Sequence, residues 1–290
     1  LGLSYYYFLS DLVRDFDANS DEIVRRLAEV AKIIFAKSNL FIETIGESGE
    51  VSAVKDHLYE IADDLPDGNV YQKHTFDFAE GNKNEAFLTS GKVQYVGEGG
   101  DFRKYGFNYT GALRVMETIL RYEYLWKKVR VQGGAYGAFT QFLSDGTAIL
   151  CSYRDPNLKQ TLETYKNLPE YIRTLELSDR EMTKYVIGTM AADEIQLTPS
   201  MKGERAMLHY LNGNSVENRR KVNDEIVNCT VEDIRKLAPL LQSVIDHSSI
   251  CVMGNEEKIH QDADVFDKIL SLPDLSLIHI SEPTRRVVIS

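Results

Sequence analysis

Residues 128–139 have the sequence KVRVQGGAYGAF, in which two glycines separate a long amphipathic segment from an apolar, strand-like one. On a continuous helix Arg130 and Tyr136 would point roughly 240° apart around the axis, at about 100° per residue. Gly133 and Gly134 tolerate positive φ and close backbone approach, so the chain can reverse direction between them. The reversal would aim a permanent cation and a phenol, both hydrogen-bond donors, at one point. Such a pair suits a carbonyl oxygen as the acceptor.

The segments on either side of this reversal predict a chain in which helices and strands interleave. Apolar residues at the helical period predict helices at residues 20–35, 52–65, 109–128, 158–175, 179–195, 216–227, 231–245 and 256–270. Alternating or apolar runs predict strands at residues 40–45, 86–96, 135–143, 147–153 and 249–254, with a turn at 97–100. The two strands that follow the glycines, at residues 135–143 and 147–153, would form a hairpin. We therefore predict an α+β fold, a layered sandwich with a mixed, mostly antiparallel sheet and helices on one face.

The sequence around the two glycines also resembles a known family. Besides Arg130 and Tyr136, the resemblance rests on YLWKKVR at residues 124–130 and on SDGTAILCSYRDP at residues 144–156. These motifs are similar to those of the presequence proteases, the peptidasome branch of the pitrilysin/insulinase zinc metallopeptidases. The resemblance covers about residues 1–272 and concerns the C-terminal half of that family. It implies a pitrilysin/processing-peptidase-like metallohydrolase fold, built from four homologous domains.

The resemblance also implies how the chain is divided. We expect residues 1–68 to be the end of the third peptidase domain, truncated at its start, because Leu1 is not Met and the chain begins in an apolar segment. Residues 69–84 would be a linker, and residues 85–273 the fourth, C-terminal domain. Residues 274–290 resemble the translation of a transposon sequencing adapter, so we exclude this tail from fold and site reasoning.

The resemblance assigns catalytic contacts to two residues of the opening motif. Arg130 and Tyr136 would donate hydrogen bonds to the substrate carbonyl and to the oxyanion that forms from it. The candidate substrate-binding residues are Gly133, Gly134, Tyr153 and Arg154. For the last two, a surface position at the end of a strand is the alternative. The expected partners are unstructured peptides and the N-terminal half of the same parent chain, which in the family binds zinc and supplies the general base.

The sequence itself lacks the pattern of a catalytic zinc site. In this superfamily two His and a Glu come from a His-x-x-Glu-His helix, joined by a distal carboxylate, and leave one zinc position open for water. The nearest approach is His57-Leu-Tyr-Glu60, where residue 61 is Ile, and a solvated helix face explains it. We therefore predict no metal site in this chain and zinc bound by the N-terminal half in the full-length parent.

Composition excludes several other classes. A net charge of −11 and a pI near 5.1 argue against a nucleic-acid partner, because neutralising phosphates needs a basic face. The sequence contains no run of eighteen apolar residues, the minimum that would predict a transmembrane helix. No serine lies in a nucleophile elbow, and the glycine-rich turn lacks the Lys-Ser/Thr of a phosphate loop. Cys151 and Cys251 lie in apolar strand patterns, so we expect buried thiols there, and together with Cys229 they imply no disulfide framework.

Three functions stay open at this point. The first is the substrate-closing half of a zinc metalloendopeptidase that degrades unstructured peptides in an enclosed chamber and is inactive as an isolated fragment. The second is a non-catalytic structural subunit of the same fold, and the third is an unrelated α/β interaction module. The presence of both Arg130 and Tyr136 favours the first, because a structural subunit has no need for the pair. A bacterial parent would be cytoplasmic, and a eukaryotic one would lie in an organelle matrix.

Overall fold

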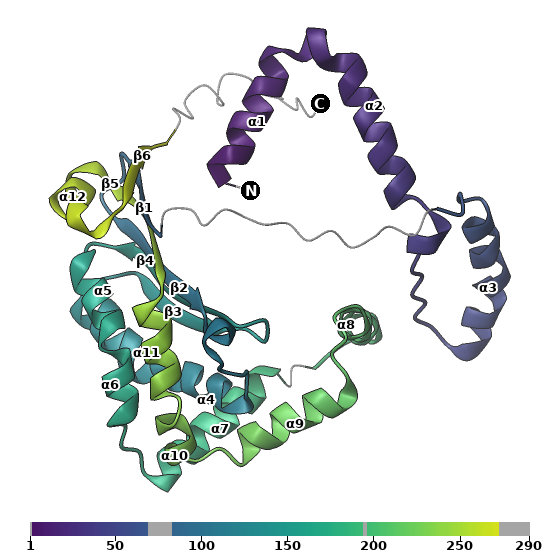
Figure 1. The fold of residues 1–290 in the computed structure, drawn as a ribbon. Helices are drawn as coiled ribbons and strands as arrows, with labels where there is room; N and C mark the ends of the chain where they lie inside the picture. Colours follow the sequence, from purple (N-terminus) through teal and green to yellow (C-terminus); the bar gives the residue numbers. More distant parts are fainter. Residues whose placement is uncertain (1, 69–82, 194–195, 273–290) are drawn as a thin grey trace, which may run out of the picture. The chain divides into compact units, whose positions relative to one another are not determined.

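The computed structural model describes residues 2–68, 83–193 and 196–272, and the chain divides into two compact units. Unit 1 comprises Leu1–Asp77 and Gln196–Asn214, and unit 2 comprises Phe78–Ile195 and Ser215–Ser290. Figure 1 labels the helices and strands of both units along the chain. Unit 1 thus includes a helix whose sequence interrupts that of unit 2. All residues that the sequence predicts as site residues belong to unit 2.

Unit 1 is helical. Its elements are α1 (Gly2–Arg14), α2 (Phe16–Ile34), the 3-10 turn η1 (Lys37–Asn39), α3 (Ser48–Asp63) and α8 (Pro199–Leu211). The ring of Phe41 stacks on Tyr210 of α8 with centroids 5.4 Å apart, which ties the interrupting helix to the loop after η1. α2 carries an apolar stripe but has no buried residue, and Val24 and Leu27 are more than 60% exposed.

Unit 2 is built on a six-stranded sheet with the order β3-β4-β2-β5-β1-β6. The strands are β1 (Asn84–Thr89), β2 (Gln94–Asp101), β3 (Gly137–Phe142), β4 (Thr147–Asp155), β5 (Ser249–Asn255) and β6 (Lys268–Ser271). β1 pairs in parallel with β5 and β6, and the other three neighbouring pairs are antiparallel. The sheet is therefore mixed and mostly antiparallel, as predicted.

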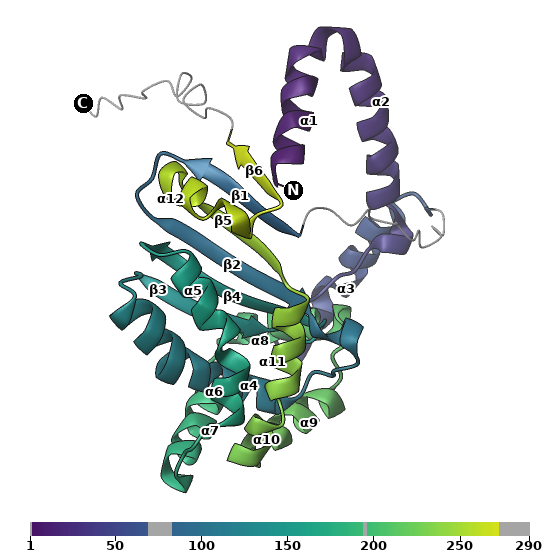
Figure 2. The same cartoon turned by 60° about the vertical axis from the view of Figure 1, so that its left-hand side comes forward.

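The helices of unit 2 lie between its strands along the sequence. They are η2 (Phe102–Tyr105), α4 (Gly111–Ile119), the π-helix η3 (Leu120–Gln132), α5 (Lys159–Lys166), α6 (Leu168–Arg173), α7 (Asp179–Asp193), α9 (Val216–Val227), α10 (Val231–Arg235), α11 (Ala238–Asp246), α12 (Glu256–Gln261) and η4 (Ala263–Val265). Figure 2 shows α5 and α11 lying over β2, which both contact. None of the helices in the described ranges combines the length and the apolar character needed to cross a lipid bilayer.

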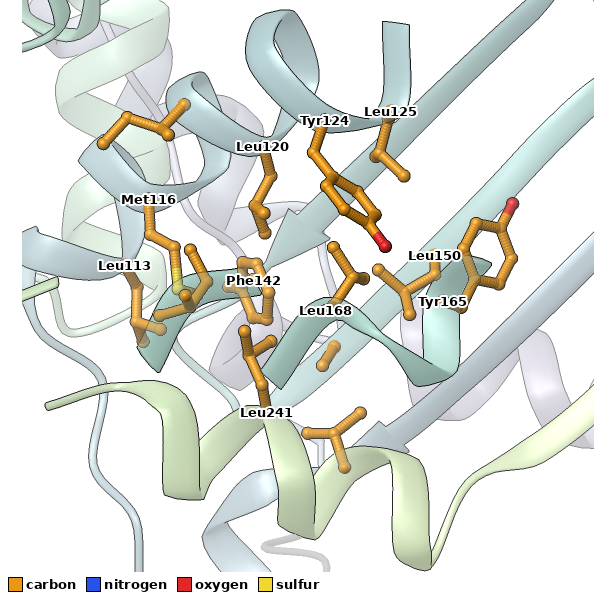
Figure 3. Close-up of a cluster of buried hydrophobic side chains, with 14 of the residues drawn as sticks. Leu113, Met116, Leu120, Tyr124, Leu125, Phe142, Leu150, Tyr165, Leu168 and Leu241 are labelled. Atoms are coloured by element: carbon orange, nitrogen blue, oxygen red, sulfur yellow. The ribbon is translucent and has the colours of Figure 1, made fainter. Parts of the chain in front are cut away.

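The core of unit 2 lies between these helices and one face of the sheet. Leu113 and Met116 of α4 meet Phe142 of β3 and Leu241 of α11 there, and all four are buried (Figure 3). Along β4, Ala148, Leu150 and Ser152 are buried, whereas the residues between them are not, so alternate side chains face away from the helices. We call the second side, to which Tyr95, Cys151, Tyr153 and Met253 point, the open face. The predicted layered α+β fold with helices on one face is confirmed.

Several predicted element boundaries are wrong. Residues 40–45 form no strand, because in the described structure this segment packs on α8 of unit 1 instead of joining the sheet. Residues 97–100 are not a turn but the middle of β2. A Cβ at Gly99 would lie 2.7 Å from the Ala148 carbonyl oxygen, so this glycine allows close strand approach. The predicted strand at 86–96 is in fact two strands, because β1 ends at Thr89.

The helices also differ from the prediction near prolines and at the end of the chain. The predicted helix at 158–175 is broken before Pro169, and that at 231–245 before Pro239, since proline starts a new helix more readily than it continues one. The predicted helix at 256–270 ends at Gln261, and its last part becomes β6, which pairs with β1. Ser178 and Glu181 cap α7 as a reciprocal pair.

The thiols are less buried than predicted. Cys251 is exposed and Cys151 half-buried, because both lie at positions of their strands that point to the open face. Cys229 is buried, and this burial raises the pKa of its thiol to about 12. The three cysteines are free thiols, in agreement with the expectation of no disulfide framework.

Removing the tail is expected to leave the fold intact. Residues 274–290 lie outside the described residues, and a deletion of residues 275–290 starts after β6, so every described element stays. We expect equal thermal midpoints for the full chain and the shortened one. A fall in Tm of more than about 5 °C, about 1 kcal/mol or more for a chain of this size, would mean that the tail contributes to packing.

Candidate functional site

The segment that leads to Arg130 is a π-helix, which the sequence analysis did not anticipate. The N–H of Gly133 donates to the carbonyl of Lys128, five residues earlier, at 3.0 Å. The buried residues of η3 are Leu120, Tyr124, Leu125 and Val129. From one turn to the next they are separated by four or five residues, more than the 3.6 residues per turn of an α-helix. Such wide turns are rare and occur frequently at functional sites. Because a π-helix has more residues per turn than an α-helix, Arg130 points in a different direction from η3 than a continuous α-helix would give it.

The two glycines end η3 in different ways. Gly134 has φ 81°, in the left-handed region that glycine adopts without penalty. Gly133 has φ −82°, but a Cβ there would lie 2.5 Å from the carbonyl oxygen of Val129. The turn therefore requires a residue without a side chain at this position. Asn157 fastens the turn by donating from Nδ2 to the Gly133 carbonyl at 2.6 Å. The sequence prediction of a glycine-dependent reversal is confirmed, with close approach at one glycine and positive φ at the other.

The turn brings Arg130 and Tyr136 together. The backbone N–H of Tyr136 donates to the Tyr153 carbonyl at 3.1 Å, which starts the β3–β4 ladder immediately after the turn. The guanidinium carbon of Arg130 then lies 5.9 Å from the centre of the Tyr136 ring. The same guanidinium carbon also lies 4.0 Å from the ring centre of Trp126, one turn earlier on η3. Both distances are within the range of cation–π attraction.

Tyr153 and Arg154 join the same group from β4. The rings of Tyr136 and Tyr153 meet edge to face at 5.6 Å, and the Arg154 guanidinium carbon lies 5.9 Å from the Tyr136 ring centre. We call Trp126, Arg130, Tyr136, Tyr153 and Arg154 the aromatic–guanidinium cluster. Tyr136 is 63% exposed and Tyr153 38%, so the cluster is a surface rather than a closed cavity.

Sequence reasoning missed two residues near this cluster. Trp126 could have been found, because it precedes Arg130 by four residues and so lies on the same helix face. Tyr95 of β2 meets Tyr153 edge to face at 5.3 Å and extends the aromatic surface over the open face. No sequence signal places Tyr95 there, because its position depends on how β2 pairs with β4.

Two members of the cluster, Arg130 and Arg154, carry positive charge. Within the described residues, no carboxylate forms an ion pair with Arg130 or Arg154. Asp155 follows Arg154 directly but is fully buried, and its carboxylate accepts hydrogen bonds from Thr161 Oγ1 at 2.6 Å and from the backbone N–H of Asn157. The acid nearest in sequence to Arg154 therefore turns into the core, and no described carboxylate pairs with either guanidinium group.

The residues present do not fit a zinc site. His57 Nδ1 and Glu60 Oε2 of α3 are 3.2 Å apart, and both side chains are about three-quarters exposed. Throughout the described part of the chain, no three His, Cys, Asp or Glu side chains converge on a position for a metal ion. A lone His–Glu pair in solvent gives zinc two of the four ligands it needs.

A cleft of about 840 Å³ lies on the helix-covered side of unit 2, between α5, α11 and the sheet. Glu98 lines it, and burial raises the pKa of this carboxyl although Ser248 Oγ donates to it at 2.7 Å. None of the predicted site residues lines this cleft. The predicted chemistry and this concavity are therefore separate features of unit 2.

Comparison with known proteins supports the resemblance. A model of the PreP C-terminal domain family matches residues 84–256. Protein HypA of Clostridium perfringens is 41% identical over 271 residues, which are 93% of this chain and 28% of that protein. Presequence protease 1, chloroplastic/mitochondrial, of Arabidopsis thaliana is 29% identical over 259 residues, 89% of this chain and 24% of that protein. The chain thus spans about a quarter of the length of these curated relatives.

Solved structures agree on the fold. The crystal structure of a peptidase M16 inactive domain from Pseudomonas fluorescens superposes with a TM-score of 0.52 at 14% identity, over 70% of this chain and 50% of that one. Pitrilysin gives a TM-score of 0.50 at 11% identity, over 82% of this chain and 26% of that one. These similarities place the fold among the pitrilysin-like M16 peptidase domains. Because the family model matches well over half of its residues, this chain belongs to the PreP C-terminal domain family, the C-terminal part of presequence proteases.

Proposed function

We propose that this chain is the substrate-closing half of a zinc metalloendopeptidase that degrades unstructured peptides in an enclosed chamber. The observation that carries the proposal is the contact of Arg130 with Tyr136 at 5.9 Å on an exposed surface. Both side chains are hydrogen-bond donors, and the described residues offer Arg130 no carboxylate partner. The pair is therefore free to address an acceptor on a peptide.

In the proposed mechanism the two donors act on the scissile carbonyl. The Tyr136 hydroxyl and the Arg130 guanidinium donate to the carbonyl oxygen, and these bonds strengthen as the oxygen becomes an oxyanion. Trp126 restricts the guanidinium by stacking with it at 4.0 Å, so little reorganisation is needed when charge develops. A donor of this kind typically contributes about 100- to 1000-fold in rate, or roughly 3 to 4 kcal/mol.

Four further residues are proposed to support or contact the substrate. Gly133 and Gly134 permit the turn that places the two donors beside each other. Tyr153 offers an aromatic edge next to Tyr136, on which an extended peptide can lie. Arg154 adds a second charge to the same ring and is considered separately below.

The proposed peptidase needs zinc from elsewhere in the parent. Since His57 and Glu60 do not form a metal site, we propose that the N-terminal half of the parent binds the ion and that this half is a partner of the chain. A structural subunit is the alternative, and it has no use for the pair of donors. A His-x-x-Glu-His helix encoded upstream in the parent gene would favour the peptidase, and its absence would favour the structural subunit.

The isolated 290-residue chain is expected to bind no stoichiometric zinc and to hydrolyse no peptide, because it lacks a ligand set. Metal analysis after dialysis, together with a quenched-fluorescence peptide assay, measures both properties. Adding the separately expressed N-terminal half of the parent should then restore cleavage. One tightly held zinc per isolated chain, or turnover without the added half, would contradict the division of labour proposed here.

A further inference from the structure

Arg154 is turned toward Tyr136 by an irregularity in β4. The pairing of β2 with β4 runs from Val96 opposite Ser152 to Gln94 opposite Asp155, so three steps along β4 match two along β2. The extra residue is a β-bulge. In a regular strand Arg154 would follow Ser152 to the helix-covered side, but Arg154 is exposed and Asp155 is fully buried. The bulge therefore presents Tyr153 and Arg154 together on the open face.

The backbone at the bulge supports the same conclusion. Arg154 has φ 48°, and no other non-glycine residue in the described ranges has a positive φ. A non-glycine residue in this region is strained, and such residues cluster at functional sites. This backbone conformation places the Arg154 guanidinium carbon 5.9 Å from the Tyr136 ring centre and 5.6 Å from that of Tyr153.

Two guanidinium groups thus share one tyrosine ring. Arg130 and Arg154 are each 5.9 Å from its centre, and neither forms an ion pair with any described residue. The chain as a whole has 44 acidic and 33 basic residues, so two neighbouring arginines without a described acidic partner contrast with its net negative charge. An anion that both groups contact would be stabilised by two positive charges. The planar fork of each Arg matches a carboxylate in particular.

We propose that Arg154, with Arg130, forms a carboxylate-binding subsite that selects peptide substrates by a carboxylate next to the bond held at Tyr136. This inference rests on the proposed function, because it adds a substrate preference to the same surface. The carboxylate has two possible sources, the C-terminus of a peptide or an Asp or Glu side chain. Arg154 is thereby a specificity-determining residue, whereas Arg130 serves both the carbonyl and the carboxylate.

Trp126 makes the proposal testable on the isolated chain. It is the single tryptophan of the sequence and lies 4.0 Å from the Arg130 guanidinium carbon, so its fluorescence reports on this site. The chain is titrated with three versions of one uncharged peptide: a free C-terminal acid, a C-terminal amide, and the amide with one internal Glu. We expect at least one carboxylate-bearing peptide to bind about tenfold more tightly than the neutral amide, as for a hydrogen bond to a charged group. Which of the two binds identifies the source.

Two variants and one matched control decide the role of Arg154. Arg154→Gln should reduce the tenfold preference to about one, and Arg154→Lys should retain part of it because charge without the fork persists. Arg180→Gln, on the exposed side of α7, removes the same charge elsewhere and should leave the preference unchanged. Equal binding of all three peptides, absence of binding at millimolar peptide, or equal losses in Arg154→Gln and Arg180→Gln would overturn the proposal.

The outcome is separable from that of the proposed function. The titration measures binding to a chain that is expected to have no activity, whereas the proposed function is tested by turnover of the parent. A carboxylate preference without catalytic loss in Tyr136→Phe would leave the subsite standing and remove Tyr136 from the catalytic mechanism. Catalytic loss in Tyr136→Phe without any carboxylate preference would do the reverse.

Discussion

Replacing Tyr136 with Phe in the full-length parent is expected to lower kcat about 100- to 1000-fold, because one oxyanion donor is lost while the ring stays. The ring keeps its edge-to-face contact with Tyr153 at 5.6 Å and its place beside Arg130, so folding and peptide binding should change little. Since such donors act mainly in the transition state, kcat and kcat/KM should fall together. Steady-state kinetics with a quenched peptide measure both.

Arg130→Lys should be comparably harmful. Lys keeps the charge but loses both the fork and the close guanidinium contact with Trp126, so the donor is no longer held in place. Tyr122→Phe is a matched control, because Tyr122 is an exposed tyrosine of the same π-helix that lies outside the cluster. A raised KM with unchanged kcat in Tyr136→Phe and Arg130→Lys would make these residues substrate-binding contacts only. Kinetics like those of the unaltered enzyme would remove them from the mechanism.

The parts of the fold that the sequence predicts well are those decided by local patterns. The β3–β4 hairpin, α7 with its Ser178 cap and α9 all follow from apolar period and turn residues, which act over a few positions. The errors occur where tertiary pairing decides. The glycines of β2 indicate a turn locally but serve close strand packing, and β6 becomes a strand only because β1 offers it an edge.

The candidate site divides in the same way. The meeting of Arg130 and Tyr136 follows from the two glycines, and Trp126 follows from its four-residue spacing to Arg130. The orientation of Arg154 does not follow, because alternation along β4 would bury it, and only the pairing with β2 reveals the bulge. The apolar pattern in the sequence also does not distinguish η3 from an α-helix. Only in the structure does the exposure of Val131 show that the turns are wider than those of an α-helix.

The turn that joins the two donors depends on Gly133, and Gly133→Ala should therefore both destabilise unit 2 and impair the parent enzyme. A Cβ at this position would lie 2.5 Å from the Val129 carbonyl oxygen and 3.2 Å from that of Lys128, and backbone atoms cannot rotate away as a side chain can. The Val129 carbonyl also accepts from the N–H of Ala135 at 3.1 Å, so its displacement loosens the start of β3. Overpacking of this kind costs about 1 to 3 kcal/mol, and each kcal/mol lowers Tm by about 2 to 4 °C in a domain of this size.

Gly137→Ala is the matched control, because nothing lies within 4 Å of a Cβ built at that position, four residues further along. Thermal unfolding of the isolated chain, followed by Trp126 fluorescence, reports on unit 2 since the only tryptophan lies beside the turn. Gly133→Ala should unfold at a lower temperature than Gly137→Ala and should change the emission of the folded state, because Arg130 shifts against the indole. In the parent it should also lower kcat, as misplacement of a donor by about 1 Å can cost about 100-fold. Equal midpoints and equal emission for the two variants would mean that the turn tolerates a side chain, and the joint placement of Arg130 and Tyr136 would then need another cause.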